Sequence, residues 1–362
     1  MKIAHINTER TFRGGEVQTL LLARELQSRG HENVIIAQNG SLLSERAGEV
    51  SIRTLLLSMR GELDPVAALR LRKVLLQELP NIIHAHTPHA GSLALLARRK
   101  RTPVVVSRRV IFPLKNFLSR LKYQKADAVL AVSQSVRNQL VMDGILDEKI
   151  HVAESGTDFS AFEKAPSQPA ARVALSIPES AFVIGNVSYF DRHKGQSLLI
   201  KAFAQFATVQ ERPCYLVLVG DGPLLDGCRS LAQHLNLADR VLFTGQRFDV
   251  ANLYAVMDLF LLSSIPPALE GWSGVLREAM GFGLPVIAVR QPATEEQIRH
   301  NETGILVSAS QEKWVEAMHR LYSDVPLCRR LAQEGMKEAR KFHVQAMADK
   351  TEACYRAVAT GG

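Results

Sequence analysis

Short apolar runs alternate with amphipathic stretches along the first half of the chain. This alternation is typical of strands followed by helices, and therefore of parallel sheets in an α/β protein. The runs predict strands at residues 2–6, 33–37, 81–84, 103–107, 128–132 and 149–153, and the first amphipathic stretch predicts a helix over 16–28.

A second series of the same kind fills the rest of the chain. It predicts strands at 182–187, 215–220, 241–243, 259–262 and 285–288, and helices at 196–207, 224–235, 250–255 and 274–281, with helices from 311 onward. The segment 158–179 between the two series contains Pro166, Pro169 and Pro178 and little apolar periodicity, which predicts a linker. Two such halves predict two Rossmann-like, doubly wound domains with a cleft between them.

Size and composition agree with this plan. At 362 residues and 40.0 kDa the chain exceeds a typical single domain. Its 46% hydrophobic and 22% charged residues exclude a disordered, collagen-like or disulfide-framework protein. No apolar run approaches the ~18 residues that a spanning helix needs, and the start does not resemble a signal peptide. The four scattered cysteines are expected to be reduced core thiols in a cytosolic protein.

The positive charge is concentrated in the first half. Residues 1–165 hold 24 basic and 16 acidic side chains, a net charge of +8, whereas residues 166–362 hold 20 of each. Between Arg98 and Lys125 there are ten basic residues and no acidic one. Such a face suits an anionic lipid surface, a phosphorylated glycan or a nucleic acid, and a solvated helix surface is the alternative.

Two glycine pairs and a histidine run follow predicted strands. Gly14-Gly15 opens the first helix, where backbone N–H groups can approach a phosphate closely, although a tight turn is the simpler interpretation. Gly220-Asp221-Gly222-Pro223 lacks the third glycine of a dinucleotide fingerprint, so we expect a structural turn. In the run 84–89, we expect the side chains of His84 and His86 to point to opposite faces of their strand, which argues against their sharing a metal ion.

The stretch 263–288 carries the clearest chemistry. Glu270 lies in a loop after a strand, and Glu278 lies eight residues later, one turn inside the next helix. Gly271 and Gly274 leave that helix N-terminus open to a closely packed ligand, and its free N–H groups suit phosphate oxygens. Because carboxylates accept paired hydroxyl hydrogen bonds, a sugar and a ribose are their natural partners.

This stretch resembles the Glu-x7-Glu motif of family 4 retaining glycosyltransferases, which have the GT-B fold. The similarity covers essentially the whole chain, with ordered matches at 14–15, 187–196, 218–223, 241–246 and 283–286. It implies two Rossmann-like domains facing a central cleft: an acceptor-side domain over 1–165 and a nucleotide-sugar donor domain over 180–343. It also implies that the C-terminal helix over 344–362 packs back on the N-terminal domain.

The resemblance also implies roles for individual residues. Glu270 would orient the donor sugar, Glu278 would bind the donor ribose, and Lys194 would stabilise the leaving diphosphate. Further groups would bind the diphosphate or lie near the nucleobase: the amides of Gly274, Val275 and Leu276, the Gly14-Gly15 turn, and Arg247. No metal or other cofactor is expected.

Two positions depart from the family pattern. Tyr189 stands where many members have an arginine. Arg192 is the nearest arginine that could replace it, and we expect Arg192 to take the catalytic role. Ser107 stands where many have a histidine at the end of a strand, so Ser107 and His86 are the candidates for lining the cleft.

We therefore expect a retaining glycosyltransferase that uses a UDP-sugar, with ADP- and GDP-sugars as alternatives. The acceptor is expected to be a glycan or lipid-linked glycan of lipopolysaccharide type. The expected location is the cytoplasm, with peripheral contact between the basic domain and an anionic inner membrane. A nucleotide-sugar or glycan-binding protein without turnover is the main alternative. A nicotinamide oxidoreductase lacks its glycine fingerprint, and nucleic acid is not expected because the basic stretch has few aromatic residues.

Overall fold

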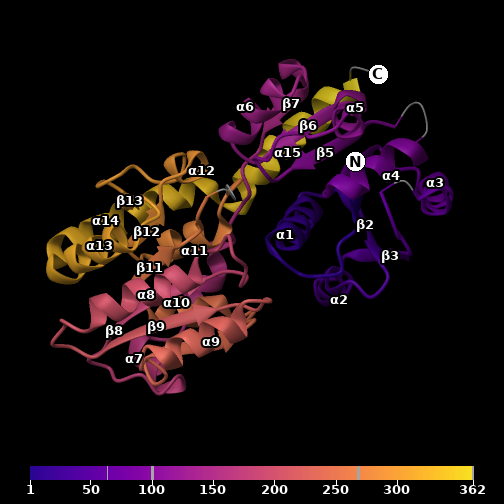
Figure 1. The fold of residues 1–362 in the computed structure, drawn as a ribbon. Helices are drawn as coiled ribbons and strands as arrows, with labels where there is room; N and C mark the ends of the chain where they lie inside the picture. Colours follow the sequence, from indigo (N-terminus) through magenta and orange to yellow (C-terminus); the bar gives the residue numbers. More distant parts are fainter. Residues whose placement is uncertain (63, 99–101, 267–269, 361–362) are drawn as a thin grey trace. The chain divides into compact units, whose positions relative to one another are not determined.

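The computed structural model describes residues 1–62, 64–98, 102–266 and 270–360. The chain forms two compact units: the first comprises Met1–Gly156 and Phe342–Gly362, and the second comprises Thr157–Lys341. Each unit is built on one parallel sheet, so the fold class is α/β with two Rossmann-like units (Figure 1). Within the described residues, no helix is both long and apolar enough to cross a membrane.

The first unit holds a seven-stranded sheet in the order β3-β2-β1-β4-β5-β6-β7, with every neighbouring pair parallel. The chain order reverses beside β1, so β1 and β4 flank a topological switch point of the kind where ligands bind in doubly wound sheets. The strands are β1 (Lys2–Asn7), β2 (Glu32–Gln38), β3 (Arg53–Leu57), β4 (Ile82–Ala85), β5 (Val104–Arg108), β6 (Ala128–Ala131) and β7 (Ile150–Val152).

The helices of this unit begin where the sequence supplies capping side chains. Asp64, Thr87, Asn116 and Ser133 each accept a hydrogen bond from a backbone N–H of the helix that follows. Helix α1 packs against α2, and α4 packs against α3 and α5. The helices are α1 (Gly14–Ser28), α2 (Leu42–Glu49), α3 (Pro65–Glu78), α4 (Pro88–Ala97), α5 (Phe117–Lys125) and α6 (Gln134–Met142).

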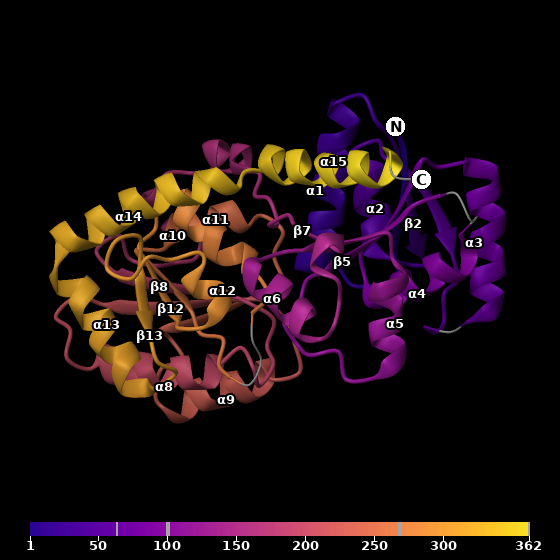
Figure 2. The same ribbon diagram turned by 90° about the horizontal axis from the view of Figure 1, so that it is seen from above.

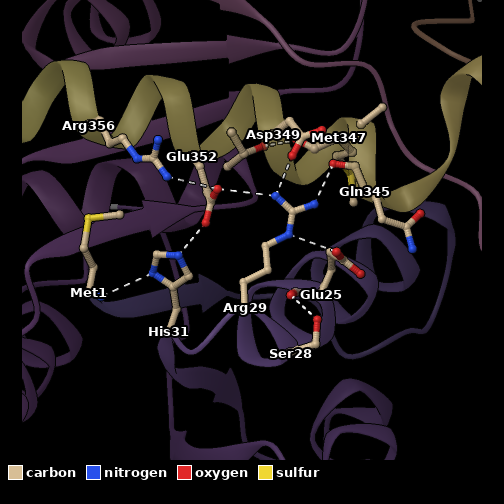
Figure 3. Close-up of polar contacts among 12 residues, drawn as sticks. Met1, Glu25, Ser28, Arg29, His31, Gln345, Met347, Asp349, Glu352 and Arg356 are labelled. Carbon is tan, nitrogen blue, oxygen red and sulfur yellow. Dashed lines mark hydrogen bonds and ion pairs between the residues drawn. The ribbon is translucent and has the colours of Figure 1, made fainter.

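The C-terminal helix α15 (Val344–Thr360) belongs to the first unit and packs against α1. Figure 3 shows the polar contacts that hold it. The guanidinium of Arg29 lies 2.6 Å from Asp349 and 3.3 Å from Glu352, and it donates to the carbonyl of Gln345. The imidazole Nε2 of His31 lies 2.5 Å from the second oxygen of Glu352. On its apolar face, Val344, Met347 and Ala348 join the core of the first unit.

The second unit holds a six-stranded parallel sheet in the order β10-β9-β8-β11-β12-β13. Its strands are β8 (Phe182–Val187), β9 (Cys214–Val219), β10 (Val241–Gly245), β11 (Leu259–Leu262), β12 (Val286–Val289) and β13 (Ile305–Val307). Its helices are α7 (Gln168–Ala174), α8 (Gln196–Ala207), α9 (Leu225–His234), α10 (Val250–Val256), α11 (Gly274–Phe282), α12 (Pro292–Glu295), α13 (Gln311–Ser323) and α14 (Val325–Ala339). Figure 2 shows helices α8 and α9 on one side of this unit and helices α10 and α11 on the other, with β8 and β12 between them. Two buried apolar clusters make up most of its core.

The segment 158–179 is not the open linker that its prolines suggested. It contains the short 3₁₀ helix Phe159–Lys164 and α7, and it belongs to the second unit. The guanidinium of Arg172 is buried, lies 2.7 Å from the carboxylate of Asp258 and donates to the carbonyl of Val256. Ala171 and Ile177 are buried in the apolar core. Tertiary packing thus orders a stretch whose local pattern is irregular.

The turn Gly220–Pro223 has a structural role. The φ angles of Gly220 and Gly222 are +139° and +149°, in a region that favours glycine. A Cβ atom would lie 2.0 Å from the carbonyl oxygen of Ser188 at Gly220, and 2.4 Å from that of Phe190 at Gly222. These glycines let the turn after β9 lie against the loop after β8, as expected for a structural turn.

Candidate functional site

Three neighbouring strands of the second unit, β8, β11 and β12, bring polar loop residues together at their carboxyl ends. Lys194 follows β8, Ser264 and Glu270 follow β11, and Gln291 follows β12. This edge of a parallel sheet is where a doubly wound domain binds its ligand.

Lys194 and Glu270 form an ion pair at the centre of this cluster. The ammonium Nζ of Lys194 lies 2.5 Å from Oε1 of Glu270, and the hydroxyl of Ser264 donates to the same oxygen at 2.5 Å. The exposed fractions of the two charged side chains are 27% for Lys194 and 13% for Glu270. The amide of Gln291 accepts from the backbone N–H of Glu270 and donates to the carbonyl of Ser264. Hydrogen bonds therefore hold both the backbone and the carboxylate of Glu270 in place.

Backbone contacts fix Lys194 from the other side. The hydroxyl of Ser263 donates to the carbonyl of Lys194 at 2.6 Å, and the N–H of Ile265 donates to that of His193 at 2.8 Å. Gly195 has a φ of +68°, and a Cβ atom there would lie 2.2 Å from the carbonyl oxygen of Ser263. Only glycine permits this approach, so the Lys194-Gly195 sequence places the ammonium beside the loop after β11.

The charge state of Glu270 follows from these neighbours. Burial raises the pKa of a carboxyl, but the ammonium of Lys194 and the hydroxyl of Ser264 outweigh it and hold the Glu270 pKa below its usual range. An ionised carboxylate next to a cation can accept hydrogen bonds from sugar hydroxyls, while the ammonium can bind an anion.

Glu278 lies in a different environment, one turn inside α11. Its Oε2 accepts a 2.9 Å hydrogen bond from the hydroxyl of Tyr254, which also lies 3.3 Å from the carbonyl of Val275. Burial raises the pKa of Glu278, partly offset by Tyr254 and the positive charge of Arg277. A Cβ atom at Gly274 would lie 4.0 Å from Oε1 of Glu278, so the second oxygen faces the start of the helix. The carboxylate thus keeps acceptor capacity there.

The start of α11 supplies free donors. Its N-cap, Ser273, makes no side-chain cap hydrogen bond, and the first N–H groups of a helix have no partner within the helix. These are the amides of Gly274, Val275 and Leu276. Together with the helix dipole they favour an anion at this end.

Two arginines with predicted roles in donor binding or catalysis, Arg247 and Arg192, lie outside the cluster around Lys194 and Glu270. Arg247 pairs with Asp249 through contacts of 2.7 Å and 2.6 Å and lines a cavity of about 420 Å³ beside β10. Arg192 is exposed in the loop between β8 and α8, and Tyr189 is half-buried in the same loop. Their expected roles remain predictions.

In the first unit, Gly14 and Gly15 open α1 as expected from the sequence. The side chain of Arg109, which follows β5, lies over this turn: its Cδ would be 3.9 Å from a Cβ atom on Gly15. The guanidinium of Arg109 lies 3.4 Å from both His86 Nδ1 and the hydroxyl of Ser155. His86 and Ser107 are both buried.

The histidine run forms a buried cluster, and the expectation of opposed side chains was wrong, because residues two apart on a strand lie on the same face. The ring centroid of His86 lies 3.9 Å from that of His84, at the end of β4. His5 on the neighbouring strand β1 completes the group, with ligand atoms of all three residues within 4.8 Å of one another. The hydroxyl of Ser107 lies 2.8 Å from His84 Nε2.

This cluster fits a hydrogen-bonded chain better than a metal site. His5 Nδ1 lies 2.9 Å from His86 Nε2, and His5 Nε2 lies 2.9 Å from the amide oxygen of Asn33. His84 Nδ1 lies 2.6 Å from the hydroxyl of Tyr355. Burial lowers the pKa of His5 to about 4, and it lowers those of His84 and His86 as well. The ring nitrogens are thus already in use, and the nearest charge is the cation of Arg109.

The basic stretch 98–125 is less open than its sequence suggested. Arg98 pairs with Asp127 at 2.6 Å, and Lys122, which is buried, pairs with Glu62 at 2.6 Å. Arg108 is also buried. Residues 99–101 lie outside the described part of the chain. Lys115, Arg120 and Lys125 are exposed. Acidic residues distant in sequence neutralise part of the patch, which the local pattern could not show.

Sequence reasoning missed several residues of these sites: Tyr254, Ser264, Gln291, His5 and Arg109. Ser264 and Gln291 each lie just beyond the carboxyl end of a predicted strand, and that position could have identified them. Tyr254 lies within α10, and nothing in its local pattern distinguishes it from a core aromatic residue.

Two family models match the chain. Residues 167–338 match "Glycosyl transferases group 1", and residues 12–161 match "Glycosyltransferase Family 4". N-acetyl-alpha-D-glucosaminyl L-malate synthase of Bacillus anthracis is 27% identical over 92% of this chain and 91% of that protein. The lipopolysaccharide core biosynthesis glycosyltransferase LpsD of Rhizobium meliloti is 31% identical over 51% of this chain and 52% of its own.

Solved structures share the fold. Anabaena HepE in complex with UDP and glucose has a TM-score of 0.86 and 21% sequence identity, covering 99% of this chain and 100% of its own. A sucrose-phosphate synthase from Thermosynechococcus elongatus has a TM-score of 0.82 at 20% identity, covering 100% of both chains.

Proposed function

Since this chain belongs to glycosyltransferase family 4 and has the GT-B fold, we propose that it transfers a sugar from a nucleotide-sugar donor with retention of anomeric configuration. A UDP-sugar is the favoured donor, because HepE, a protein of the same fold, was solved with UDP and with UDP-glucose. The observation that carries the proposal is the ion pair between Lys194 and Glu270, which lies at the carboxyl ends of β8 and β11.

In this proposal the second unit binds the donor. Glu278 accepts hydrogen bonds from ribose hydroxyls through the oxygen that Tyr254 leaves free. The amides at the start of α11 bind diphosphate oxygens, and Arg247 lies near the nucleobase. The Gly14-Gly15 turn of the first unit contributes to phosphate binding.

Glu270 and Lys194 act on the reacting end of the donor. The carboxylate of Glu270 accepts hydrogen bonds from donor sugar hydroxyls and so orients the sugar. When the glycosidic bond breaks, negative charge develops on the leaving diphosphate, and the Lys194 ammonium stabilises it, assisted by Arg192. Because contacts on both sides fix Lys194, little reorganisation accompanies this step. No residue of the cluster requires a metal for this chemistry.

The acceptor is proposed to be a glycan or a lipid-linked glycan of the cell envelope. The names of relatives support this class: LpsD and LpsE of Rhizobium meliloti are lipopolysaccharide core glycosyltransferases. The first unit is proposed to bind the acceptor, because it carries the net positive charge of the chain, which would attract an anionic glycan.

The first unit is also proposed to contact an anionic membrane surface peripherally, from the cytoplasmic side. On α3, Leu69 and Leu76 are 68% and 43% exposed, and Arg70, Arg72 and Lys73 lie exposed among them. The start of α5 and the residues just before it also combine exposed apolar and basic side chains: Phe117 and Leu118 with Lys115 and Arg120. Exposed apolar side chains flanked by cations are typical of helices that lie on anionic lipid surfaces.

Vesicle co-sedimentation tests the membrane contact. Changing Arg70, Arg72 and Lys73 together to Gln should weaken binding to anionic vesicles, because each cation near such a surface contributes about 1 kcal/mol. The matched control changes three exposed cations of the second unit, Lys313, Lys337 and Lys341, to Gln. Equal sedimentation of both variants and the unmodified protein would refute the α3 surface.

A nucleotide panel tests the donor assignment. In thermal-shift measurements UDP-sugars should raise the melting temperature more than ADP- or GDP-sugars, since a ligand at 100 times its dissociation constant adds about 2.7 kcal/mol. Glu278→Ala should remove the shift, whereas Glu295→Ala, at an exposed position on α12, should retain it. A protein that no nucleotide sugar stabilises would contradict the assignment.

A further inference from the structure

We propose that Arg109 binds a phosphoryl group of a ligand at the start of α1 in the first unit. This deepens the proposed function and rests on it, because a phosphorylated substrate is what such a transferase would place there. None of the sequence motifs that resemble the family contains Arg109, and the site follows from its surroundings.

Arg109 comes directly after β5, at the carboxyl edge of the sheet and beside the switch point between β1 and β4. Its aliphatic stem lies over the Gly14-Gly15 turn, with Cδ 3.9 Å from where a Cβ atom of Gly15 would be. A Cβ atom at position 15 would make an ordinary van der Waals contact with this stem, so the turn and the Arg109 side chain are direct neighbours. The absence of a side chain on Gly14 and Gly15 thus leaves the backbone amides and the guanidinium beside each other.

The guanidinium has few partners for a group with five donors. Its contacts with His86 and Ser155 are both 3.4 Å long, and its Nε atom is buried without a hydrogen-bond partner. Among the residues that the structure describes, no carboxylate is within ion-pair distance of it. Glu16, the acid with the strongest influence, is already bonded to the N–H of Arg13 and the amide of Asn7. Burial lowers the pKa of Arg109 to about 10, as expected for a cation lacking a counter-charge.

The long contacts with His86 and Ser155 orient the Arg109 guanidinium without neutralising its positive charge. If Arg109 donates to Nδ1 of His86, the Nε2 proton of His86 points to His5, and that of His5 points to Asn33. This chain of neutral imidazoles orients the guanidinium and adds no negative charge.

A phosphoryl group satisfies the unused donors best. A guanidinium binds two phosphate oxygens through parallel N–H groups, and the third oxygen is available to the free amides that open α1. A carboxylate has too few oxygens for both sets of donors, and a neutral sugar offers no charge. The phosphoryl group has two sources: the diphosphate of the donor, or a phosphate carried by the acceptor.

The test compares Arg109→Gln and Arg109→Lys with Arg356→Gln, a control at an exposed arginine on α15 of the same unit. Calorimetry measures the affinity of the full-length protein for UDP and for uridine, and thermal shift measures stabilisation by inorganic phosphate. For a donor phosphate, Arg109→Gln should weaken UDP binding about tenfold to hundredfold and leave uridine unchanged. For an acceptor phosphate, UDP affinity should stay the same while stabilisation by inorganic phosphate is lost. In either case Arg109→Lys should retain part of the binding.

The melting temperature without ligand separates this role from a structural one. Removing a cation that lacks a counter-charge should leave the melting temperature of Arg109→Gln equal to or above that of the unmodified protein, whereas loss of a structural contact would lower it. The proposal is overturned if Arg109→Gln binds UDP and phosphate as Arg356→Gln does, or if the unmodified protein binds neither. Binding of inorganic phosphate without binding of any nucleotide sugar would refute the proposed donor and leave the Arg109 site standing.

Discussion

Lys194 and Glu270 illustrate how neighbouring groups hold two charged side chains in place in the second unit. Each is partly buried, each is the other's ion-pair partner, and neighbouring backbone and amide groups hold both in place. The ammonium is therefore fixed before any ligand arrives, which is the condition under which one charged group contributes most to transition-state stabilisation.

Lys194→Ala should therefore lower turnover by on the order of a hundredfold or more. It should also destabilise the fold, because among the described residues Ser264 would then be the one side chain bonded to the buried Glu270 carboxylate. The measurement is initial-rate kinetics beside thermal unfolding, with Lys201→Ala, at an exposed position on α8, as the control. Turnover close to that of the control would remove Lys194 from the proposed mechanism.

At this scale the sequence identified the charged groups but not their partners. Glu270, Glu278 and Lys194 are recognisable because glycines and strand ends surround them in a known pattern. Tyr254 is not, since its hydroxyl reaches Glu278 only through the packing of α10 near α11. Likewise, the pairing of Lys122 with Glu62 joins residues sixty positions apart.

At the scale of elements, β1, β4 and β5 of the first unit share a buried polar group. His5 on β1 and His84 on β4 are paired across the sheet, and Ser107 on β5 bonds to His84. Through Tyr355, the same group joins the C-terminal helix α15 to the sheet. The salt bridges of Arg29 and Glu352 hold the other side of that helix (Figure 3). Helix α15 is thus held by a buried hydrogen bond of Tyr355 on one side and by the salt bridges of Arg29 on the other.

This arrangement predicts a pH dependence of stability. The pKa of His5 is about 4 in the folded protein and about 6.5 in the unfolded chain, so the folded state favours the neutral imidazole. Its contribution is present above pH 6.5 and is lost as the pH falls towards 4, in total about 3 kcal/mol. Denaturant unfolding at a series of pH values should show this decline, and His5→Gln should make it shallower, leaving the part that the buried His84 and His86 contribute. An unchanged pH slope in His5→Gln would contradict the assignment.

Most elements of the fold were predictable from periodicity. The helix expected over 196–207 is α8 with the same bounds, and the strand expected over 259–262 is β11. β3, β13 and α7 were missed. The strands β3 and β13 lie at the edges of their sheets and are only five and three residues long. The helix α7 depends on the ion pair between Arg172 and Asp258 for its place.

At the scale of the whole molecule, the division of charge matches the division into units. The half of the chain with the net charge of +8 forms nearly all of the first unit, and the half with no net charge forms nearly all of the second. This separation is visible in the composition of the two halves. Composition could not predict which cations remain exposed, because that depends on ion pairs such as Arg98 with Asp127 that form only in the folded chain.

The anomeric configuration of the product tests the proposed mechanism most directly. Proton NMR should follow the sugar released or transferred from the UDP-α-sugar that stabilises the protein best, before mutarotation mixes the anomers. We predict that the first-formed product is the α-anomer and that Glu270→Gln and Lys194→Ala strongly slow its appearance. A β-anomer formed first would contradict retention, and a rate unaffected by both substitutions would contradict the assignment of this site.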